Sequence, residues 1–240
     1  MALPKLEHPK FDLTIPSTKA KISFRPYTVK EQKILLMLKE STETEELITN
    51  LKDLIASCCI GTINIEKLTY FDIEYIFLKM RSRSVGETST VTFKCNNTLR
   101  ENVCGAISEI EVDLNSVEVD FSDSENQDIS IENNIIIRLS YPGIRSVKLL
   151  EEYDNTRNID SLIKAICLDI ESIKDDETIY DDYSKQELEE FISNLSIDSF
   201  ESILKFYISA PKLKKKIEFN CKKCGHKDNI MLSGLSDFFD

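Results

Sequence analysis

The chain has 240 residues, of which 42 are acidic and 30 basic, so that its formal net charge is −12. This charge disfavours electrostatic binding to nucleic acid, which needs a positive surface. No run approaches the roughly 18 apolar residues of a membrane-spanning helix, and the N-terminus lacks the apolar segment of a signal peptide. We expect a soluble intracellular protein with no membrane partner and a core of its own.

The first half of the chain predicts an extended arm, a strand and three helices. Three prolines indicate the arm, over residues 1–18, and Lys21–Phe24 has the composition of a strand. Thr28 and Glu31 have the spacing of a capping box. Apolar residues at helical spacing predict helices over Val29–Glu40, Glu43–Cys59 and Thr69–Arg83.

The second half predicts a similar order of elements after an acidic linker, residues 116–133. The segment Asn134–Ser140 is rich in β-branched isoleucine, which predicts a strand. Ser184 and Glu187 have the spacing of a second capping box. Apolar periodicity predicts helices over Ile144–Tyr153, Asn158–Ile173, Ser184–Asn194 and Asp198–Ser209.

Two segments share one pattern, in which a β run ends at a cysteine, a turn closes with Cys-Gly, and a second β run follows. Their cysteines are Cys95 and Cys104 in the first segment, and Cys221 and Cys224 in the second. Each hairpin tip supplies two sulfurs, and tetrahedral zinc requires four, so both hairpins together predict one structural Zn²⁺ ion. Gly105 and Gly225, directly after the second cysteines, suit a turn through positive φ.

Other interpretations of these cysteines stay open at this point: a degenerate remnant without zinc, or a redox pair. The first turn is irregular because eight residues separate its cysteines. A redox motif should open a helix, whereas strands are predicted here. His226 is expected to neighbour the metal without binding it. Cys58, Cys59 and Cys167 lie in apolar helical runs and are predicted to be buried and inert.

These elements predict an α+β fold, mainly helical with short strands, in two tandem divergent repeats that each end in a zinc-knuckle-like hairpin. The segments at residues 22–27 and 137–142 align, and each precedes a helix with paired leucines. Chance similarity between two amphipathic halves is the alternative. The predicted parts are an extended N-terminal arm at 1–18, a first helical repeat at 19–115, an acidic linker at 116–133 and a second helical repeat at 134–240.

Three stretches carry a family resemblance: Leu13–Ser41, which contains Ile22-Ser-Phe-Arg-Pro-Tyr27, then Phe71–Glu87, and Cys221–His226 together with Leu232–Phe239. They resemble the baseplate hub and hub assembly proteins of T-even-type bacteriophages, and the resemblance covers nearly the whole chain. It implies a structural or assembly role in the central hub of a contractile tail baseplate, with other phage baseplate hub proteins as partners. Members of that family are either assembly chaperones or hub components. The implied location is the host cytoplasm during assembly or the virion tail baseplate.

The sequence predicts no enzyme. There is no glycine-rich phosphate loop, and neither His8 nor His226 has an evident nucleophile to serve. The alternative function is a zinc-ribbon nucleic-acid-binding adaptor, which would use the lysines at 212–216, 222 and 223. Those lysines could equally offset the charge of a tetrathiolate site or dock an acidic partner.

Two further groups are candidates for partner binding. Arg81 and Arg83 end an aromatic helix, where guanidinium groups could bind carboxylates of a partner or interact with the helix C-terminus. Phe238 and Phe239 lie near the end of the sequence, where they could anchor a partner or fold back onto the core.

Overall fold

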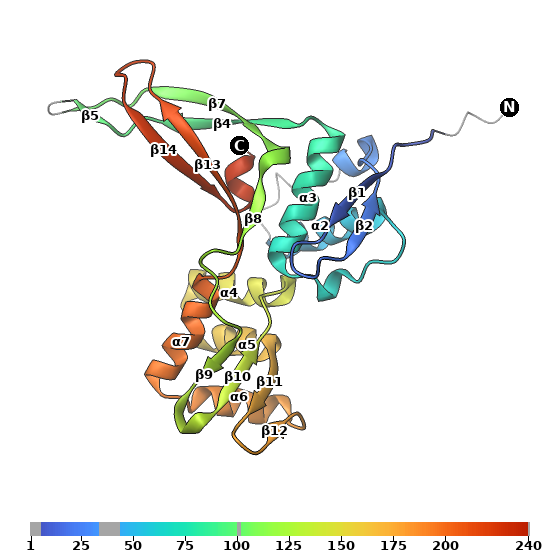
Figure 1. Ribbon diagram of the computed structural model, residues 1–240, viewed down its shortest axis with the longest axis vertical. Helices are drawn as coiled ribbons and strands as arrows, with labels where there is room; N and C mark the ends of the chain where they lie inside the picture. The colour runs from blue at the N-terminus through green and yellow to red at the C-terminus, as the bar shows by residue number, and fades with distance from the viewer. Residues whose placement is uncertain (1–5, 34–43, 100–101, 240) are drawn as a thin grey trace.

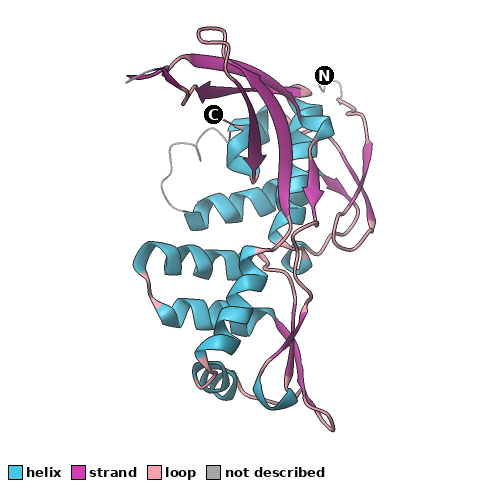
Figure 2. Cartoon of the chain, turned by 60° about the vertical axis from the view of Figure 1, so that its left-hand side comes forward, coloured by secondary structure: helices cyan, strands magenta, loops and turns pink. Residues whose placement is uncertain are grey.

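The computed structural model describes residues 6–33, 44–99 and 102–239. The chain forms two lobes arranged along the long axis of the molecule (Figure 1). The first lobe contains residues before 121 and after 211, and the second contains the segment between them. Figure 2 shows the same two lobes from the side. They touch where the Tyr70 N–H donates to the Pro142 carbonyl, at 2.8 Å, and where the rings of Phe71 and Tyr141 meet edge to face.

The N-terminal part of the first lobe is a small antiparallel sheet covered by helices. Its elements are β1 (Phe11–Thr14), β2 (Lys21–Phe24), α2 (Thr44–Cys58), β3 (Cys59–Ile60), the 3₁₀ turn η1 (Ile65–Lys67) and α3 (Tyr70–Ser84). The strand order is β1-β2-β3. Phe24, Ile55 and Ile76 are buried together between this sheet and the helices.

Two long hairpins complete the first lobe. Their elements are β4 (Thr88–Lys94), β5 (Thr98–Leu99), β6 (Asn102–Val103), β7 (Ile107–Asp113), η2 (Leu114–Ser116), β8 (Glu118–Asp120), β13 (Lys212–Asn220), β14 (Lys227–Ser233) and η4 (Leu235–Phe238). Strand β4 pairs with β7, and β13 pairs with both β14 and β8. Alternate residues of the two hairpins, such as Val91, Val112 and Leu232, face one another in a shared core.

The second lobe is a four-stranded antiparallel sheet with four helices. Its elements are β9 (Asp128–Ser130), η3 (Glu132–Asn134), β10 (Ile136–Leu139), α4 (Ile144–Thr156), α5 (Ile159–Asp169), β11 (Ile170–Lys174), β12 (Ile179–Tyr180), α6 (Lys185–Ser193) and α7 (Ile197–Ile208). The strand order is β12-β11-β10-β9, and Leu139, Ile166 and Phe206 are fully buried in its separate core. Because Asp120 pairs with Lys212, the chain leaves the first lobe and returns to it at one place.

The prediction of a mainly helical chain is wrong, and the predicted tandem repeats are not observed. In the part of the chain that the structure describes, about 40% of the residues are helical and 29% are strand, and the strands form five small sheets. Helices α2 and α3 precede the first long hairpin, whereas four helices, α4 to α7, precede the second. The second hairpin packs against α3 and the first hairpin, away from the helices that precede it in sequence.

Several local predictions are confirmed, and one is wrong. The strand Lys21–Phe24 and the capping box of Ser184 and Glu187 occur as predicted, and residues 29–33 are helical. The rest of the helix predicted to reach Glu40 lies outside the described residues. The helix predicted to reach Ile173 ends at Asp169, because Ile170–Lys174 pairs with β10 as a strand. No helix in the described part of the chain is long and apolar enough to cross a membrane.

The C-terminal tail is part of the core of the first lobe. Phe238 is fully buried in the cluster that contains Leu78 and Leu114. The carboxylate of Glu74 on α3 accepts a hydrogen bond from the Leu235 N–H at 2.9 Å, and burial raises the pKa of Glu74 to about 7. These contacts fasten the turn after β14 to α3.

We expect Phe238→Ala to lower the free energy of unfolding by about 3–5 kcal/mol, because it leaves a cavity in a closed core. Ile107→Ala is the control, since Ile107 is 71% exposed and its loss should change stability by less than about 0.5 kcal/mol. Urea unfolding of both variants measures the difference. Equal stability of Phe238→Ala and the wild type would contradict the packing described for the tail.

Candidate metal centre

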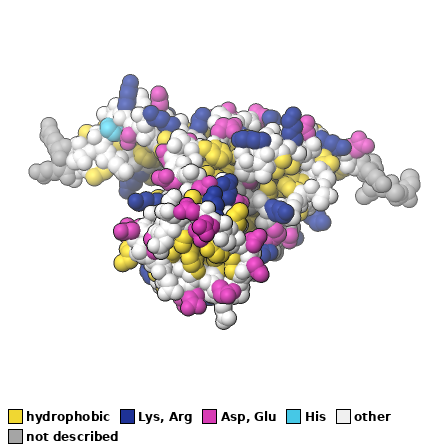
Figure 3. All heavy atoms as spheres, turned by 60° about the horizontal axis from the view of Figure 1, so that its bottom comes forward, with side chains coloured by type: hydrophobic (Ala, Val, Ile, Leu, Met, Phe, Trp, Pro, Cys, Tyr) yellow, Lys and Arg dark blue, Asp and Glu magenta, His cyan; other side chains and the backbone are white. Residues whose placement is uncertain are grey.

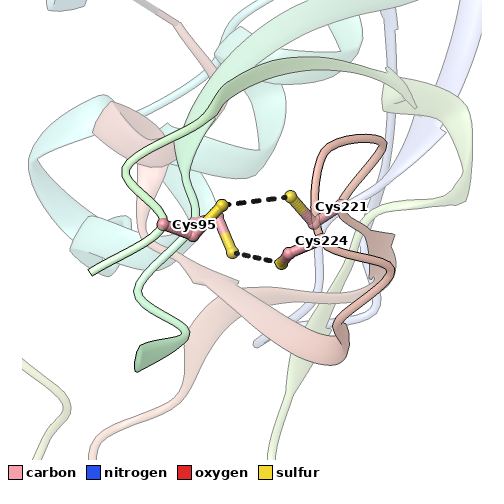
Figure 4. A group of neighbouring side chains, drawn as sticks. Cys95, Cys221 and Cys224 are labelled. Atoms are coloured by element: carbon pink, nitrogen blue, oxygen red, sulfur yellow. Dashed lines mark hydrogen bonds between the residues drawn. The ribbon is translucent and has the colours of Figure 1, made fainter. Parts of the chain in front are cut away.

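The four predicted metal ligands meet at the tips of the two long hairpins. Their sulfur atoms all lie within 4.8 Å of one another. Two of these distances join the two hairpins: 3.8 Å between the sulfurs of Cys95 and Cys224, and 3.8 Å between those of Cys104 and Cys221. Figure 4 shows the sulfurs of the two turns directed toward one another. Cysteines 117 and 129 positions apart in the sequence are thus in direct contact.

This geometry suits a tetrahedral ion. Four sulfurs that each lie about 2.3 Å from zinc at the corners of a regular tetrahedron are about 3.8 Å from one another. Cys95, Cys104 and Cys221 are buried, and Cys224 is partly exposed. Phe93 and Phe219 pack in the same small cluster as the cysteines, with their ring centroids 4.8 Å apart. The arrangement can hold one metal ion with protein ligands alone.

The turns have the backbone geometry expected from their glycines. Gly105 has φ +63° and Gly225 has φ +72°, which confirms the prediction of positive φ after each second cysteine. The Gly225 N–H donates to the carbonyl of Cys221 at 2.8 Å, and the Gly105 N–H donates to that of Cys95 at 3.0 Å. The same closing hydrogen bond therefore forms in both turns.

The irregular spacing of the first turn has a structural explanation. The Cys104 N–H donates to the Asn97 carbonyl at 2.7 Å, which closes the chain just beyond Cys95. Of the eight intervening residues, Thr98–Leu99 pairs with Asn102–Val103 as the small hairpin of β5 and β6. The turn is thus a short cysteine turn with a hairpin inserted in it, and sequence spacing alone obscured this similarity to the second turn.

Hydrogen bonds and burial give the sulfurs different proton affinities. The backbone N–H of His226 lowers the pKa of Cys224 to about 6 against the effect of burial, and the side-chain amide of Asn97 assists. The Asn97 N–H acts in the same direction on Cys95, but burial and the neighbouring sulfurs raise the pKa of Cys95 to about 12. Without a cation the cluster therefore retains protons, which a metal ion must displace to bind.

Two residues next to the cluster, Lys223 and His226, form hydrogen bonds with its cysteines. The Lys223 ammonium donates to the carbonyl of Cys104 at 3.3 Å, and His226 contacts the cluster through its backbone. Cys58, Cys59 and Cys167 lie elsewhere, and burial raises the pKa of all three, to about 11 for Cys59 and Cys167. Cys58 is buried as predicted, whereas Cys59 and Cys167 are only partly buried. The sequence did not indicate Asn97 as a neighbour of the metal centre.

The four residues predicted to bind partners make contacts within the molecule. The Arg81 guanidinium lies 5.7 Å from the ring centre of Phe239, and Arg83 forms an ion pair with Glu87 at 2.5 Å. Phe239 also packs edge to face on Phe77. Phe238 is buried, as in the alternative in which the tail folds back on the core. Partner binding by these residues remains a prediction.

Comparison with protein families matches residues 8–240 to the family described as T4 bacteriophage base plate protein. The matched range includes all four cysteines of the cluster, nearly all of both lobes and the whole C-terminal tail. Comparison with curated proteins and with solved structures gave no match.

The positive φ of Gly225 gives a testable prediction for the second turn. Gly225→Ala should lower the free energy of unfolding by about 1 kcal/mol, because a Cβ is strained in the left-handed region even though no atom lies within 4 Å of it. Gly86→Ala is a matched control, since Gly86 lacks a positive φ and also has open space around its Cβ position. Thermal unfolding compares the two. A loss as large for Gly86→Ala would show that backbone strain is not the cause.

Proposed function

We propose that the chain acts in the central hub of a contractile tail baseplate, as an assembly protein or a hub component. The chain belongs to the T4 bacteriophage base plate protein family. The family match, which covers nearly the whole chain, is the observation that carries this proposal. Membership supports a structural protein of the phage tail that contacts other phage structural proteins. The narrower assignment to the hub rests on the resemblance of the Phe-Arg-Pro segment and of the α3 sequence to hub proteins.

The cysteine cluster supports a structural function for the metal. We propose that one Zn²⁺ is held by Cys95, Cys104, Cys221 and Cys224. Four thiolates fill a tetrahedral coordination sphere, so no position remains for a catalytic water molecule. The ion would instead join the tips of two hairpins whose other ends are already fixed by α3 and the tail.

Such a metal cross-link would give the first lobe a rigid surface for binding other hub proteins. A two-stranded hairpin is marginally stable alone, and each long hairpin extends beyond the α3 core toward the cysteines. A metal ion that links Cys104 to Cys221 would close a loop of 117 positions and so lower the conformational entropy of the unfolded chain. Binding surfaces on the two hairpins would therefore keep a fixed relative position.

We expect the purified protein to contain about one zinc per chain, and Cys95→Ser and Cys221→Ser each to lose most of it, because each removes one of four ligands. Cys167→Ser is the matched control, since this half-buried cysteine lies outside the cluster. Plasma mass spectrometry measures the metal. Full zinc occupancy in Cys95→Ser would show that the first hairpin does not bind the ion. A wild-type protein that contains no zinc would contradict the proposed site.

The hub assignment predicts selective association with hub proteins. A tagged chain expressed during infection should copurify with central baseplate proteins identified by mass spectrometry, and not with peripheral ones. Its presence in purified virions would distinguish a hub component from an assembly chaperone. Association with peripheral baseplate proteins alone would contradict the hub assignment while leaving family membership unaffected. Retention on heparin with a steep salt dependence would instead favour the nucleic-acid adaptor.

A further inference from the structure

Helix α7 of the second lobe exposes two isoleucines that its own fold does not cover. Ile197 is 77% exposed and Ile208 is 75% exposed. They are eleven positions apart, which at about 100° per residue places them within roughly 20° of the same direction around the helix. The opposite face of α7, with Ile203 and Phe206, is fully buried in the core of the lobe.

The residues between the two isoleucines give this face a definite pattern. Glu201 and Lys205 are exposed on it, and Leu204 is partly buried between them. We name these five residues, Ile197, Glu201, Leu204, Lys205 and Ile208, the α7 stripe. Among the described residues, neither Glu201 nor Lys205 forms an ion pair. Both charges of the stripe are therefore available to another molecule.

The α7 stripe is complementary to itself when it is reversed. If two antiparallel copies of α7 are centred between Ser202 and Ile203, Ile197 of each lies level with Ile208 of the other. Glu201 of each copy then lies one residue, about 1.5 Å along the axis, from Lys205 of the other. Leu204 occupies the middle of the contact in both copies. A two-fold axis thus matches apolar ends with apolar ends and each charge with its opposite, as an isologous dimer contact requires.

We propose that the protein self-associates through an antiparallel contact between the α7 stripes of two copies. The occupant of this surface is a second copy because the charge order of the stripe fits its own reverse. The contact lies in the second lobe, away from the metal centre (Figure 1). Figure 3, which brings the second lobe forward, shows apolar side chains at its surface among acidic and basic ones. The first lobe therefore stays accessible to other proteins in the dimer.

The size of the contact predicts a weak dimer. Helix α7 has 12 residues and is about 18 Å long, so a contact along it is smaller than the roughly 1,200–2,000 Å² of a standard interface. We expect a dissociation constant in the micromolar range or above. High local concentration in an assembly would favour the dimer over the monomer.

Sedimentation velocity of the full chain between about 1 and 500 µM tests the proposal. The wild type should show a concentration-dependent monomer–dimer equilibrium. Ile208→Gln and Ile197→Gln should each weaken it at least tenfold, and Lys205→Glu should do the same because it places two acidic groups opposite each other. The double variant Glu201→Lys/Lys205→Glu should restore association to within about threefold of the wild type, because the swap recreates both pairs.

Ile107→Gln on β7 is the matched control, since this isoleucine is 71% exposed but lies in the first lobe. It should leave the dimer unchanged, and circular dichroism should show the same fold in all variants. The proposal is overturned by a wild type that stays monomeric at the highest concentration, or by a swapped variant as weak as Lys205→Glu. Equal weakening by Ile107→Gln would place the contact on a different surface.

Discussion

The approach of four sulfurs between two hairpin tips is the constraint on which the first lobe depends. Each hairpin has only two strands near its tip, and the core there is small, with Phe93 and Phe219 as its main ring contact. A hairpin of that kind has little stability of its own. Contacts between cysteines more than a hundred positions apart therefore bring the two tips together beyond the core that the hairpins share, at a spacing that would fit one metal ion.

The second lobe is inserted into the first at a single junction. Strand β8 leads out of the first lobe and β13 leads back into it, and the two pair from Glu118–Asp120 to Lys212–Lys214. Because both crossings lie at this junction, the second lobe can carry its own core and its own exposed helix without displacing the hairpin tips. Phe238 and the Glu74 hydrogen bond then close the first lobe at the end opposite the cysteines.

The sequence predicted the clustering of the four cysteines better than the fold that holds them. Cysteine spacing and the following glycines depend on local chemistry, so they indicated which four cysteines lie together although β5 and β6 interrupt the first turn. Helices were also found from local signals such as the capping box at Ser184. Strands were underestimated because pairing is long-range: Ile170–Lys174 continued an apolar helical run and became a strand only through β10. The packing of the second hairpin on α3 likewise had no local signal.

Two lysines of the basic segment, Lys214 and Lys223, form specific contacts within this acidic protein. Lys214 binds Asp120 at 3.0 Å and Asp123 at 2.6 Å, and so fastens the junction where the chain enters and leaves the second lobe. Lys223 donates to a carbonyl beside the sulfurs, where four thiolates around Zn²⁺ would carry a net charge of −2. Lysines that serve the junction and the metal centre do not require nucleic acid as a ligand. With a net charge of −12 over the whole chain, the fold accounts for Lys214 and Lys223 without an adaptor function.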